Sequence, residues 1–424
     1  MSSVSVTPAR QQSLSLLQWL EGVGWPGLAL IGLLVLIARR PEAVFAAEFS
    51  WEEATAFYIP TFFLDPVAQL TEAWGGTFQV VPRICYVLLG AVPVLWAPLA
   101  ENLLAMAGLL AVAGFVASRR LSPVVPDRRL RLVLAGMLLV MPAQRDVIGA
   151  LMNSQWYGGL WLILLPMASI PRSATGRWLE RVLAVLVALT GPFSTLLAPL
   201  YAWRLRRNRT RHDIWLAAIV VAGGVVQLVA ILSNGRAEVI EQRPAELAAT
   251  TFWLHSVIVP MLGERLSTAL GSAGIPAAVL AIGGIALGVA LAVTAWRSMP
   301  RSSLPFFYGA TAVGVSGIAI HGGANVWPPG AYERYFLAAG ALMIAIVIAG
   351  LVRRERLAVF LAVLLGVGVL TDFRLDPYPS QGWSETHTCV GSTSPCVIPV
   401  WPPGYQVHWP GMGQDYDIPD HIDP

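Results

Sequence analysis

Two adjacent carboxylates, Glu52 and Glu53, are the residues of this sequence best suited to act as a catalytic base. They follow Trp51 in the first long polar stretch of an otherwise apolar chain. Neighbouring residues on a helix point about 100° apart, so only one of the two can face a given cavity. A local interpretation competes, because Ser50 followed by Glu53 is the S-x-x-E pattern of a capping box. The pattern leaves open which carboxylate would act as the base.

A second polar stretch, residues 143–156, carries groups that suit the binding of a sugar. Amide and carboxylate side chains hydrogen-bond to hydroxyls, and an aromatic ring can cover the C–H face of a pyranose. The alternative is an aromatic belt at a membrane surface, with solvated charges beside it. The candidate residues in this stretch are Asp146, Asn153, Gln155 and Trp156.

Two arginines could bind an anion such as a lipid phosphate. Arg83 lies where the first polar stretch returns to apolar sequence, and snorkelling to the membrane surface is the commoner explanation for a single arginine there. Arg334, followed by Tyr335, opens a late apolar segment. A phosphate at that position would meet a guanidinium group and the N–H groups of a helix start. His321 lies in the same late polar segment, and Glu333 could instead neutralise Arg334 within the protein.

The sequence contains no Walker loop, no GxGxxG unit, no HExxH motif and no histidine cluster with metal-ligand spacing. Nucleotide-driven chemistry normally uses such phosphate-binding loops. A nucleotide-sugar donor loses support with them. The weaker candidates elsewhere are His255, Glu264 and Arg265, for which an interfacial helix is a sufficient explanation.

Membrane-spanning helices are the elements predicted to hold these residues. The chain has 424 residues, 56% hydrophobic and only 12% charged, whereas a soluble domain carries about 25% charged residues. Apolar runs near the ~20 residues needed to cross a bilayer recur along the chain. We expect an all-α polytopic membrane protein with about eleven transmembrane helices between residues 20 and 371. The first span, 20–38, has no cleavage site after it and is expected to be retained.

Arginine placement predicts the orientation, because short cytoplasmic loops are rich in basic residues. All 28 basic residues are Arg. Most of them lie in five clusters, near residues 119–131, 172–181, 204–211, 297–301 and 353–356. We place these clusters and the N-terminus, 1–19, in the cytoplasm. The outward segments are then 39–82, 143–156, 233–272, 321–335 and the tail 372–424. The Arg-only, Ala- and Gly-rich composition suggests a bacterial protein, hence one of the inner (cytoplasmic) membrane.

Two stretches do not fit simple spans. Residues 83–98 are expected to form a half-inserted helix on the outer side, before a span at 99–117. Residues 178–203 have Gly191-Pro192 in the middle, which predicts a broken helical hairpin whose limbs, at about 18 Å, are shorter than the ~30 Å apolar core. Non-helical backbone at that depth must be buried or line a wet cavity. Thr190–Ser194 is therefore a cavity candidate, and a simple proline kink is the alternative.

The tail 372–424 is rich in Pro, Trp and Asp and is expected to form a small extracytoplasmic cap of turns and extended chain. Cys389 and Cys396 have six residues between them, a spacing that can close a small disulfide loop. Such a bond requires an oxidising compartment. Cys85 lies in an apolar run and is predicted to be a core residue.

The order of these features resembles the polytopic glycosyltransferases of the GT-C fold, which use polyprenyl- or dolichyl-phosphate sugars as donors. The likeness rests on one N-terminal span, the acidic pair after an aromatic in Trp51-Glu52-Glu53, Pro82-Arg83 at re-entry, the second polar loop, and Arg334-Tyr335 opening a late helix. The resemblance implies a first-loop carboxylate as the base and a late arginine on the lipid phosphate. Many members have Asp in the first loop, where this chain has Glu-Glu.

By that resemblance, the chain would move a hexosyl or pentosyl group from a polyprenyl-phosphate donor to a glycan, lipid or protein acceptor on the outer face, with inversion. The carboxylate would deprotonate an acceptor hydroxyl while the ionised lipid phosphate leaves, so no general acid is needed, unlike in glycoside hydrolysis. Some relatives need a divalent cation. Glu52 with Glu53 or Asp146 could hold Mg²⁺ or Mn²⁺, and this is left open. Nucleic acid is not an expected partner.

Two other functions stay open. A lipid-linked sugar flippase or transporter would place ionisable residues deep within its spans, or paired broken helices in two matching halves; here only the Gly191-Pro192 break qualifies. An O-antigen polymerase or ligase would concentrate its chemistry in one large late loop with Arg and His. The largest acidic loop of this chain is instead the first.

Overall fold

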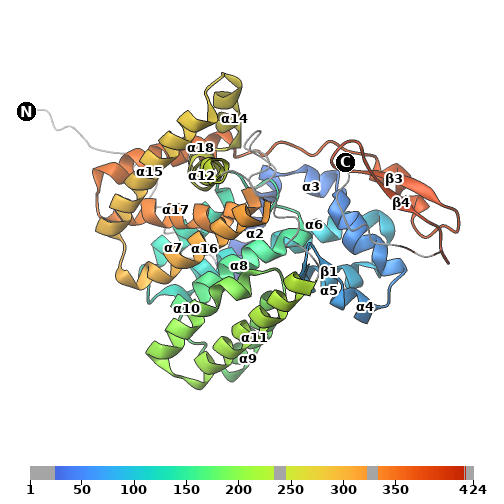
Figure 1. Ribbon diagram of the computed structural model, residues 1–424, viewed down its shortest axis with the longest axis horizontal. Helices are drawn as coiled ribbons and strands as arrows, with labels where there is room; N and C mark the ends of the chain where they lie inside the picture. The colour runs from blue at the N-terminus through green and yellow to red at the C-terminus, as the bar shows by residue number, and fades with distance from the viewer. Residues whose placement is uncertain (1–23, 234–244, 322–332, 415, 417–424) are drawn as a thin grey trace, which may run out of the picture.

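The chain folds into a helical bundle with a small mixed domain at one end (Figure 1). A computed structural model describes residues 24–233, 245–321, 333–414 and 416, with the backbone alone at 245–248, 277 and 317–321. The predicted cytoplasmic N-terminus, 1–19, lies outside these residues. Strands in the described part are limited to two short antiparallel hairpins, β1–β2 (Ala73–Trp74, Thr77–Phe78) and β3–β4 (Cys396–Val400, Tyr405–Trp409). The predicted helical class is confirmed.

Four helices in the described part are long and apolar enough to cross a membrane. They cover Val94–Ala117 (η3, Val94–Trp96, with α6, Ala97–Ala117), Arg211–Ser233 (α11), Ala278–Ser298 (in α15, Ala277–Ser298) and Glu333–Val352 (η10, Glu333–Phe336, with α17, Leu337–Val352). Shorter apolar helices occupy Trp25–Arg39, Val80–Leu89, Ala249–Leu262 and Arg356–Thr371. A membrane-spanning bundle is supported, whereas these lengths do not confirm about eleven spans.

These shorter apolar helices and further helices complete the bundle. They are α2 (Trp25–Arg39), α5 (Val80–Leu89), α7 (Arg128–Val140), α8 (Ser154–Leu164), α9 (Ala174–Ala188), α10 (Phe193–Asn208), α12 (Ala245–Trp253), α14 (Glu264–Ser272), α16 (Leu304–His321) and α18 (Arg356–Thr371). Of these, α12 and α14 lie within the stretch 233–272, the predicted outward polar segment. Short turns of helix connect them: α3 (Glu42–Phe45), η1 (Glu53–Tyr58), η2 (Ile59–Phe62), α4 (Pro66–Thr71), η4 (Arg119–Leu121), η5 (Leu151–Asn153), η6 (Leu165–Met167), η8 (Leu254–Ile258), α13 (Val259–Leu262), η9 (Arg301–Ser303), α19 (Trp383–Thr386) and η11 (His387–Cys389).

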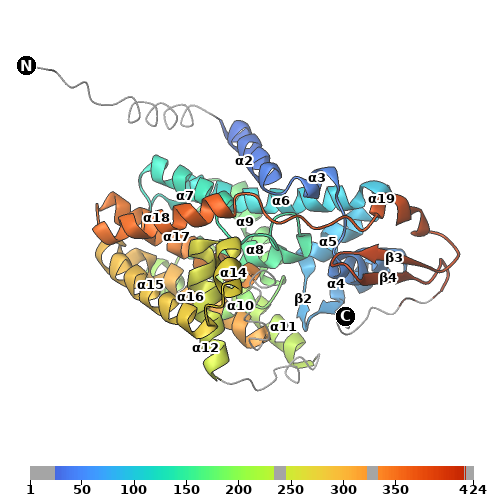
Figure 2. The same cartoon turned by 90° about the horizontal axis from the view of Figure 1, so that it is seen from above.

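Because successive helices run back and forth, their connections gather at two ends of the bundle. One end holds the α6–α7, α8–α9, α10–α11, α15–α16 and α17–α18 connections, with the five arginine clusters; we call it the arginine-rich end. Ion pairs tie these connections together, Arg120 to Glu180 across 2.5 Å and Arg297 to Glu355 across 3.6 Å. The opposite end holds the first loop, the 141–153 loop and the tail, and we call it the tail-covered end (Figure 2).

The two irregular stretches of the predicted topology are also irregular in the structure. Helix α5 has ten residues, about 15 Å at 1.5 Å per residue, which is half of a bilayer core. Helices α9 and α10 form the expected hairpin, with 15 and 16 residues, and they meet at Thr190–Pro192. The backbone at Gly191 has φ +76°, which glycine adopts readily because it has no Cβ.

The apex of the α9–α10 hairpin is filled by the turn of chain that follows β2. The Gly191 N–H donates to the Phe78 carbonyl at 2.9 Å, and the Val81 N–H donates to Thr190 Oγ1 at 3.0 Å. The side-chain amide of Gln227 on α11 pairs with both backbone groups of Phe78. These bonds satisfy the non-helical backbone of the break. The Thr190–Ser194 cavity candidate is therefore a docking point for the first loop.

The first loop and the tail share one hydrophobic core, and we call the unit that they form the loop–tail domain. The ring centres of Phe49 and Trp383 lie 5.1 Å apart, edge to face, and those of Phe62 and Trp409 lie 5.4 Å apart. Glu48 accepts backbone N–H bonds from the chain just before α19. The tail is therefore not an independent cap, because its apolar face is buried against the first loop.

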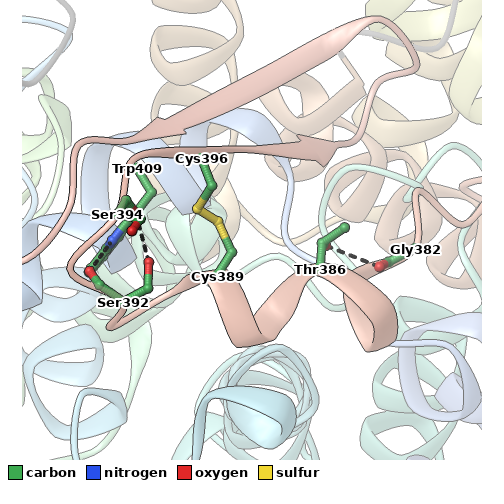
Figure 3. Close-up of a disulfide and its surroundings, with 7 residues drawn as sticks. All are labelled: Gly382, Thr386, Cys389, Ser392, Ser394, Cys396 and Trp409. Atoms are coloured by element: carbon green, nitrogen blue, oxygen red, sulfur yellow. Dashed lines mark hydrogen bonds between the residues drawn. A yellow bond between two sulfur atoms is a disulfide. The ribbon is translucent and has the colours of Figure 1, made fainter.

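The predicted disulfide between Cys389 and Cys396 is present in the tail, with the two Cα atoms 6.3 Å apart. It joins the turn after α19 to the first residue of β3 (Figure 3). The indole N–H of Trp409 on β4 donates to the Ser392 carbonyl at 2.9 Å within the closed loop. The disulfide and this bond fix the end of the hairpin that packs on the first loop.

Candidate functional site

Two adjacent arginines at the end of α2, Arg39 and Arg40, contact different parts of the protein. Arg39 is fully buried and donates to the carbonyls of Leu139 and Met141, at 2.8 and 2.9 Å. These carbonyls lie at the C-terminal end of α7, where a cation is favoured. Arg39 therefore anchors α2 to α7. Arg40 donates to the carbonyl of Ile148 in the 141–153 loop and turns toward the tail.

Aromatic residues of the tail cover Arg40. Its guanidinium group lies 3.9 Å from the ring centre of Tyr378, and Tyr378 stacks on Trp401 with 3.8 Å between ring centres. Arg145 lies 5.1 and 5.7 Å from the same two rings, within the range of cation–π attraction. The Trp51 N–H of the first loop donates to the Trp401 carbonyl at 2.7 Å. Three separate segments therefore meet at this point.

Asp146 lies beside these rings and is only 6% exposed. Its Oδ1 accepts a hydrogen bond from the Tyr378 hydroxyl at 3.3 Å, whereas its Oδ2 has no hydrogen-bond partner in the described part of the chain. Burial raises the pKa of Asp146, although the positive charges of Arg334, Arg145 and Arg40 oppose the rise. Buried polar atoms are normally hydrogen-bonded, so this oxygen marks a place where a ligand could bind.

Arg334, at the start of η10, connects this group to the first loop. The carboxylates of Glu52 and Asp146 both act electrostatically on its guanidinium group. Glu52 and Arg334 are each half-buried, so both remain accessible to a ligand. We call Arg40, Glu52, Arg145, Asp146, Arg334 and Tyr378 the Asp146 cluster. It unites one of the two predicted bases with the predicted phosphate-binding arginine.

Glu53, the other predicted base, is used inside the loop–tail domain. It is 3% exposed, its Oε2 accepts the Ser50 N–H at 3.0 Å, and its own N–H donates to Ser50 Oγ at 3.4 Å. The predicted capping box is therefore confirmed. Burial raises the pKa of Glu53, while the hydrogen bonds from Ser50 oppose the rise. The turn that follows, η1, is a π-helix, and it is Glu52 that acts on Arg334.

Glu101 on α6 is a buried acid that sequence reasoning did not select. It lies close enough to Glu53 to act on that carboxyl group electrostatically, and its Oε1 accepts the Leu151 N–H at 2.5 Å. Glu101 thereby joins the first loop, which carries Glu52, to the 141–153 loop, which carries Asp146.

Within the predicted sugar-binding stretch, residues 143–156, Asn153 helps to hold Asp146 in place. The side chains of Gln155 and Trp156 instead contact partners outside the Asp146 cluster. Asn153 Nδ2 donates to the Asp146 carbonyl at 2.6 Å. Gln155 turns the other way and accepts from Gln79 at 3.2 Å. Trp156 is buried against Tyr335, with 4.4 Å between ring centres. Its faces are covered by neighbouring rings, so it does not offer the open platform expected for a pyranose.

Arg83 does not join the cluster. Arg83 is fully buried, donates to the Ala56 carbonyl and lies 4.5 Å from the ring centre of Phe57. These contacts hold η1 in place. The guanidinium group is buried and therefore not available to a lipid headgroup. His321 ends α16, and its side chain lies outside the described residues. Tyr335 is buried and hydrogen-bonds to Arg334.

The three weaker candidates lie beside the cluster. Glu264 begins α14 and pairs with Arg145 at 3.4 Å, and burial raises its pKa to about 7. Arg265 pairs with Asp376 of the tail at 2.6 Å. His255 is buried and stacks on Phe336, with 5.7 Å between ring centres. Of these, Glu264 is the one whose charge reaches the cluster.

The cation site considered for Glu52, Glu53 and Asp146 gains no support from the geometry. No three His, Cys, Asp or Glu residues of the described chain lie together as a metal-binding group. Glu53 is held in its capping box, and Asp146 faces arginines. Any cation at this place would need ligands from the substrate.

Sequence reasoning missed two cluster residues, Arg40 and Tyr378, and also Trp401, which stacks on Tyr378. Arg40 had a visible signal, because a double arginine at the outer end of the first helix departs from the placement of basic residues in cytoplasmic loops. An anionic partner is the expected reason for such a departure. Tyr378 and Trp401 carried no signal, since nothing in the tail's sequence indicates which aromatic residue packs on which loop.

Comparison of the chain with protein-family models, with curated proteins and with solved structures found no match. The resemblance to the GT-C glycosyltransferases therefore stays a prediction, and the Asp146 cluster carries the functional argument.

Proposed function

We propose that this chain is a membrane glycosyltransferase that moves a sugar from a polyprenyl-phosphate donor to an acceptor hydroxyl, with inversion. The observation that supports the proposal is that Glu52 lies close enough to Arg334, beside the buried Asp146, to act on its guanidinium group electrostatically. An accessible carboxylate and an accessible guanidinium group, brought together from opposite parts of the chain, are the base and the anion-binding group that this transfer needs.

Glu52 is the proposed base. Its carboxylate takes the proton of the acceptor hydroxyl as the oxygen attacks the anomeric carbon, and the bond from that carbon to the phosphate oxygen breaks. The departing lipid phosphate carries its own negative charge, so no second carboxyl group has to protonate it. Glu53 orients Glu52 by fixing the first turn of the helix through Ser50.

Arg334 is the proposed partner of the leaving phosphate. Arg40 and Arg145 add positive charge on the side of the tail, where they contact Tyr378. All three arginines act electrostatically on the carboxylate of Asp146, and Arg40 and Arg145 also pair with Glu42 and Glu264. A phosphate would complete the charge balance of the cluster and could approach a guanidinium group in a bidentate manner.

The proposed setting is the bacterial inner membrane, with about eleven helical segments between residues 20 and 371. The arginine-rich end is then cytoplasmic, in keeping with the distribution of basic loops, and the Asp146 cluster and tail lie outside. The disulfide of the tail supports an oxidising outer compartment. The acceptor is a glycan, a lipid or a protein with an accessible hydroxyl group.

The test is sugar transfer by membranes that carry matched amounts of the protein, supplied with radiolabelled polyprenyl-phosphate sugars. Glu52→Gln should lower the rate by about 10²–10⁴-fold, the usual contribution of a general base. Glu72→Gln is the matched control, because Glu72 is an exposed carboxylate of the same loop. Full activity in Glu52→Gln would remove the proposed base. If no donor were transferred by the wild type while labelled lipid crossed the bilayer, a transporter would replace the enzyme.

A further inference from the structure

An apolar cavity lies inside the bundle at the arginine-rich end, away from the Asp146 cluster. Its volume is about 80 Å³, and part of it is open to the outside. Helices α6, α7, α8 and α17 form its walls, with Leu138, Leu160 and Ile344 among the lining residues. Its volume is not explained by the proposed transfer reaction.

The lining of the cavity has almost no polar groups that could hydrogen-bond to water. Ser303 has the only hydroxyl group among the lining residues, and this hydroxyl already donates to the Pro300 carbonyl at 2.6 Å. Buried water needs two to four polar partners, and apolar cavities stay dry or take apolar guests. The occupant of this cavity is therefore expected to be a hydrocarbon chain.

The cavity reaches the level of the interhelical connections. Leu121, Val124 and Val125 of the α6–α7 connection line it, as do Met299 and Ser303 of the α15–α16 connection. The guanidinium group of Arg131 fixes this rim by donating to the carbonyls of Val125 and Pro126, both at 2.8 Å. A chain in the cavity would therefore begin at the bundle end, where a lipid headgroup lies.

Exposed arginines lie close in sequence to the residues of this rim. Arg119 lies two residues before Leu121, Arg128 three residues after Val125, and Arg301 two residues before Ser303. An apolar cavity with a positively charged rim is complementary to a lipid that has an apolar chain and an anionic headgroup. A zwitterionic lipid would fill the same cavity but would leave the arginines without a counter-charge.

We propose that this cavity binds one chain of an anionic phospholipid, whose phosphate headgroup contacts Arg119, Arg128 and Arg301. The site is independent of the sugar transfer, because it lies at the opposite end of the bundle from the Asp146 cluster. It would couple the packing of α6, α7, α8 and α17 to the charge of the surrounding membrane.

Native mass spectrometry of the full chain in detergent tests the proposal, with phosphatidylglycerol and phosphatidylcholine of identical acyl chains as probes. The wild type should retain one phosphatidylglycerol and release phosphatidylcholine more readily. Ala345→Phe should abolish retention, because the added ring occupies the cavity. Ala349→Phe is the matched control, one turn further along α17 and outside the lining residues. Ala341→Leu is a smaller filler in case Ala345→Phe fails to fold.

The headgroup contact is tested separately by Arg301→Gln and Arg119→Gln. Each should weaken phosphatidylglycerol retention about fivefold, the effect of one basic residue at an anionic surface. Arg356→Gln is the control, because Arg356 is exposed in the α17–α18 connection, which does not line the cavity. Equal retention of both lipids, or retention that survives both cavity-filling substitutions, would overturn the proposal.

Discussion

Buried charged side chains at the two ends of the bundle differ in whether they have partners. At the arginine-rich end they are paired: Arg204 and Asp213 meet at 2.5 Å, and Glu180 accepts from both Arg120, at 2.5 Å, and His212, at 2.7 Å. Each pair joins two helices or connections. The remaining donors of Arg204 bond to the carbonyls at the end of α8.

In the described part of the chain, the unpartnered buried atoms of charged groups at the arginine-rich end include Arg120 Nη2, Arg181 Nε and His212 Nδ1, whereas at the tail-covered end they include carboxylate oxygens. Asp146 Oδ2 and both carboxylate oxygens of Glu333 have no hydrogen-bond partner among the described residues. Burial of this kind costs stability unless a ligand or a proton completes the site. The carboxylates at the arginine-rich end therefore hold the bundle together, whereas Asp146 and Glu333 at the tail-covered end lack such partners among the described residues.

The largest expected effect comes from comparing the stability of two variants, one with a substitution at each end of the bundle. Asp213→Asn should lower the free energy of unfolding by about 3–5 kcal/mol, because it leaves the buried Arg204 without its counter-charge. Asp146→Asn should leave that free energy unchanged or raise it, since burial already disfavours the charged form of Asp146. Thermal unfolding in detergent measures both. Equal losses in the two variants would remove the distinction between the ends.

Sugar-transfer activity should be lost on substitution at the tail-covered end and kept on substitution at the arginine-rich end. Arg334→Gln should lower sugar transfer by about 10²–10³-fold, the usual cost of removing one group that stabilises developing negative charge. Arg353→Gln, an exposed arginine at the other end, should transfer at the wild-type rate. The measurement is kcat with a saturating polyprenyl-phosphate sugar. A normal kcat in Arg334→Gln would exclude Arg334 from the transition state.

The pH dependence of stability should come from the tail-covered end. The pKa of Glu264 is about 7, above its ordinary value of 4.5. A carboxyl group with a raised folded-state pKa stabilises the protein fully below pH 4.5, and this contribution is lost as pH rises toward 7. The loss should be about 3 kcal/mol. Glu264→Gln should flatten the decline of Tm between pH 5 and 8, and an unchanged slope would contradict this assignment.

The smallest expected effect concerns the attachment of the tail. The disulfide closes a loop with a sequence separation of 7, so its removal should cost about 2 kcal/mol in the chain-entropy account. Cys396→Ser should therefore lower Tm slightly and leave the bundle folded. Protease sensitivity of the tail measures the same loosening. A large loss of helix on reduction would show that the tail supports more than the loop–tail domain.

Sequence reasoning found the helical segments because their apolar length is a local property. The break at Gly191-Pro192 and the capping box of Ser50 and Glu53 were also readable, since each depends on residues close in the chain. Choosing between Glu52 and Glu53 was not possible from local pattern. That choice depended on Glu101 in α6 and on Arg334 near the other end of the chain.

The same limit explains the errors in the site. Arg83 and Trp156 have the right residue types for binding and lie at or near the edge of a polar stretch, yet both are buried by partners that come from elsewhere. Arg40 and Tyr378 became cluster residues through one contact across more than three hundred positions. Long-range packing decides exposure, and exposure decides which polar side chains are free to meet a ligand.

By itself, the sequence determined that this chain forms a bundle of apolar helices, that its basic residues fall in one set of connections, and that its acids gather in the other. Those properties follow from hydrophobicity and charge, which act along short stretches of chain. Only the tertiary structure decided that the tail would cover the first loop, that Glu53 would be buried beside Glu101, and that Glu52 would meet Arg334. These outcomes depend on how surfaces far apart in the sequence fit together, which no local pattern encodes.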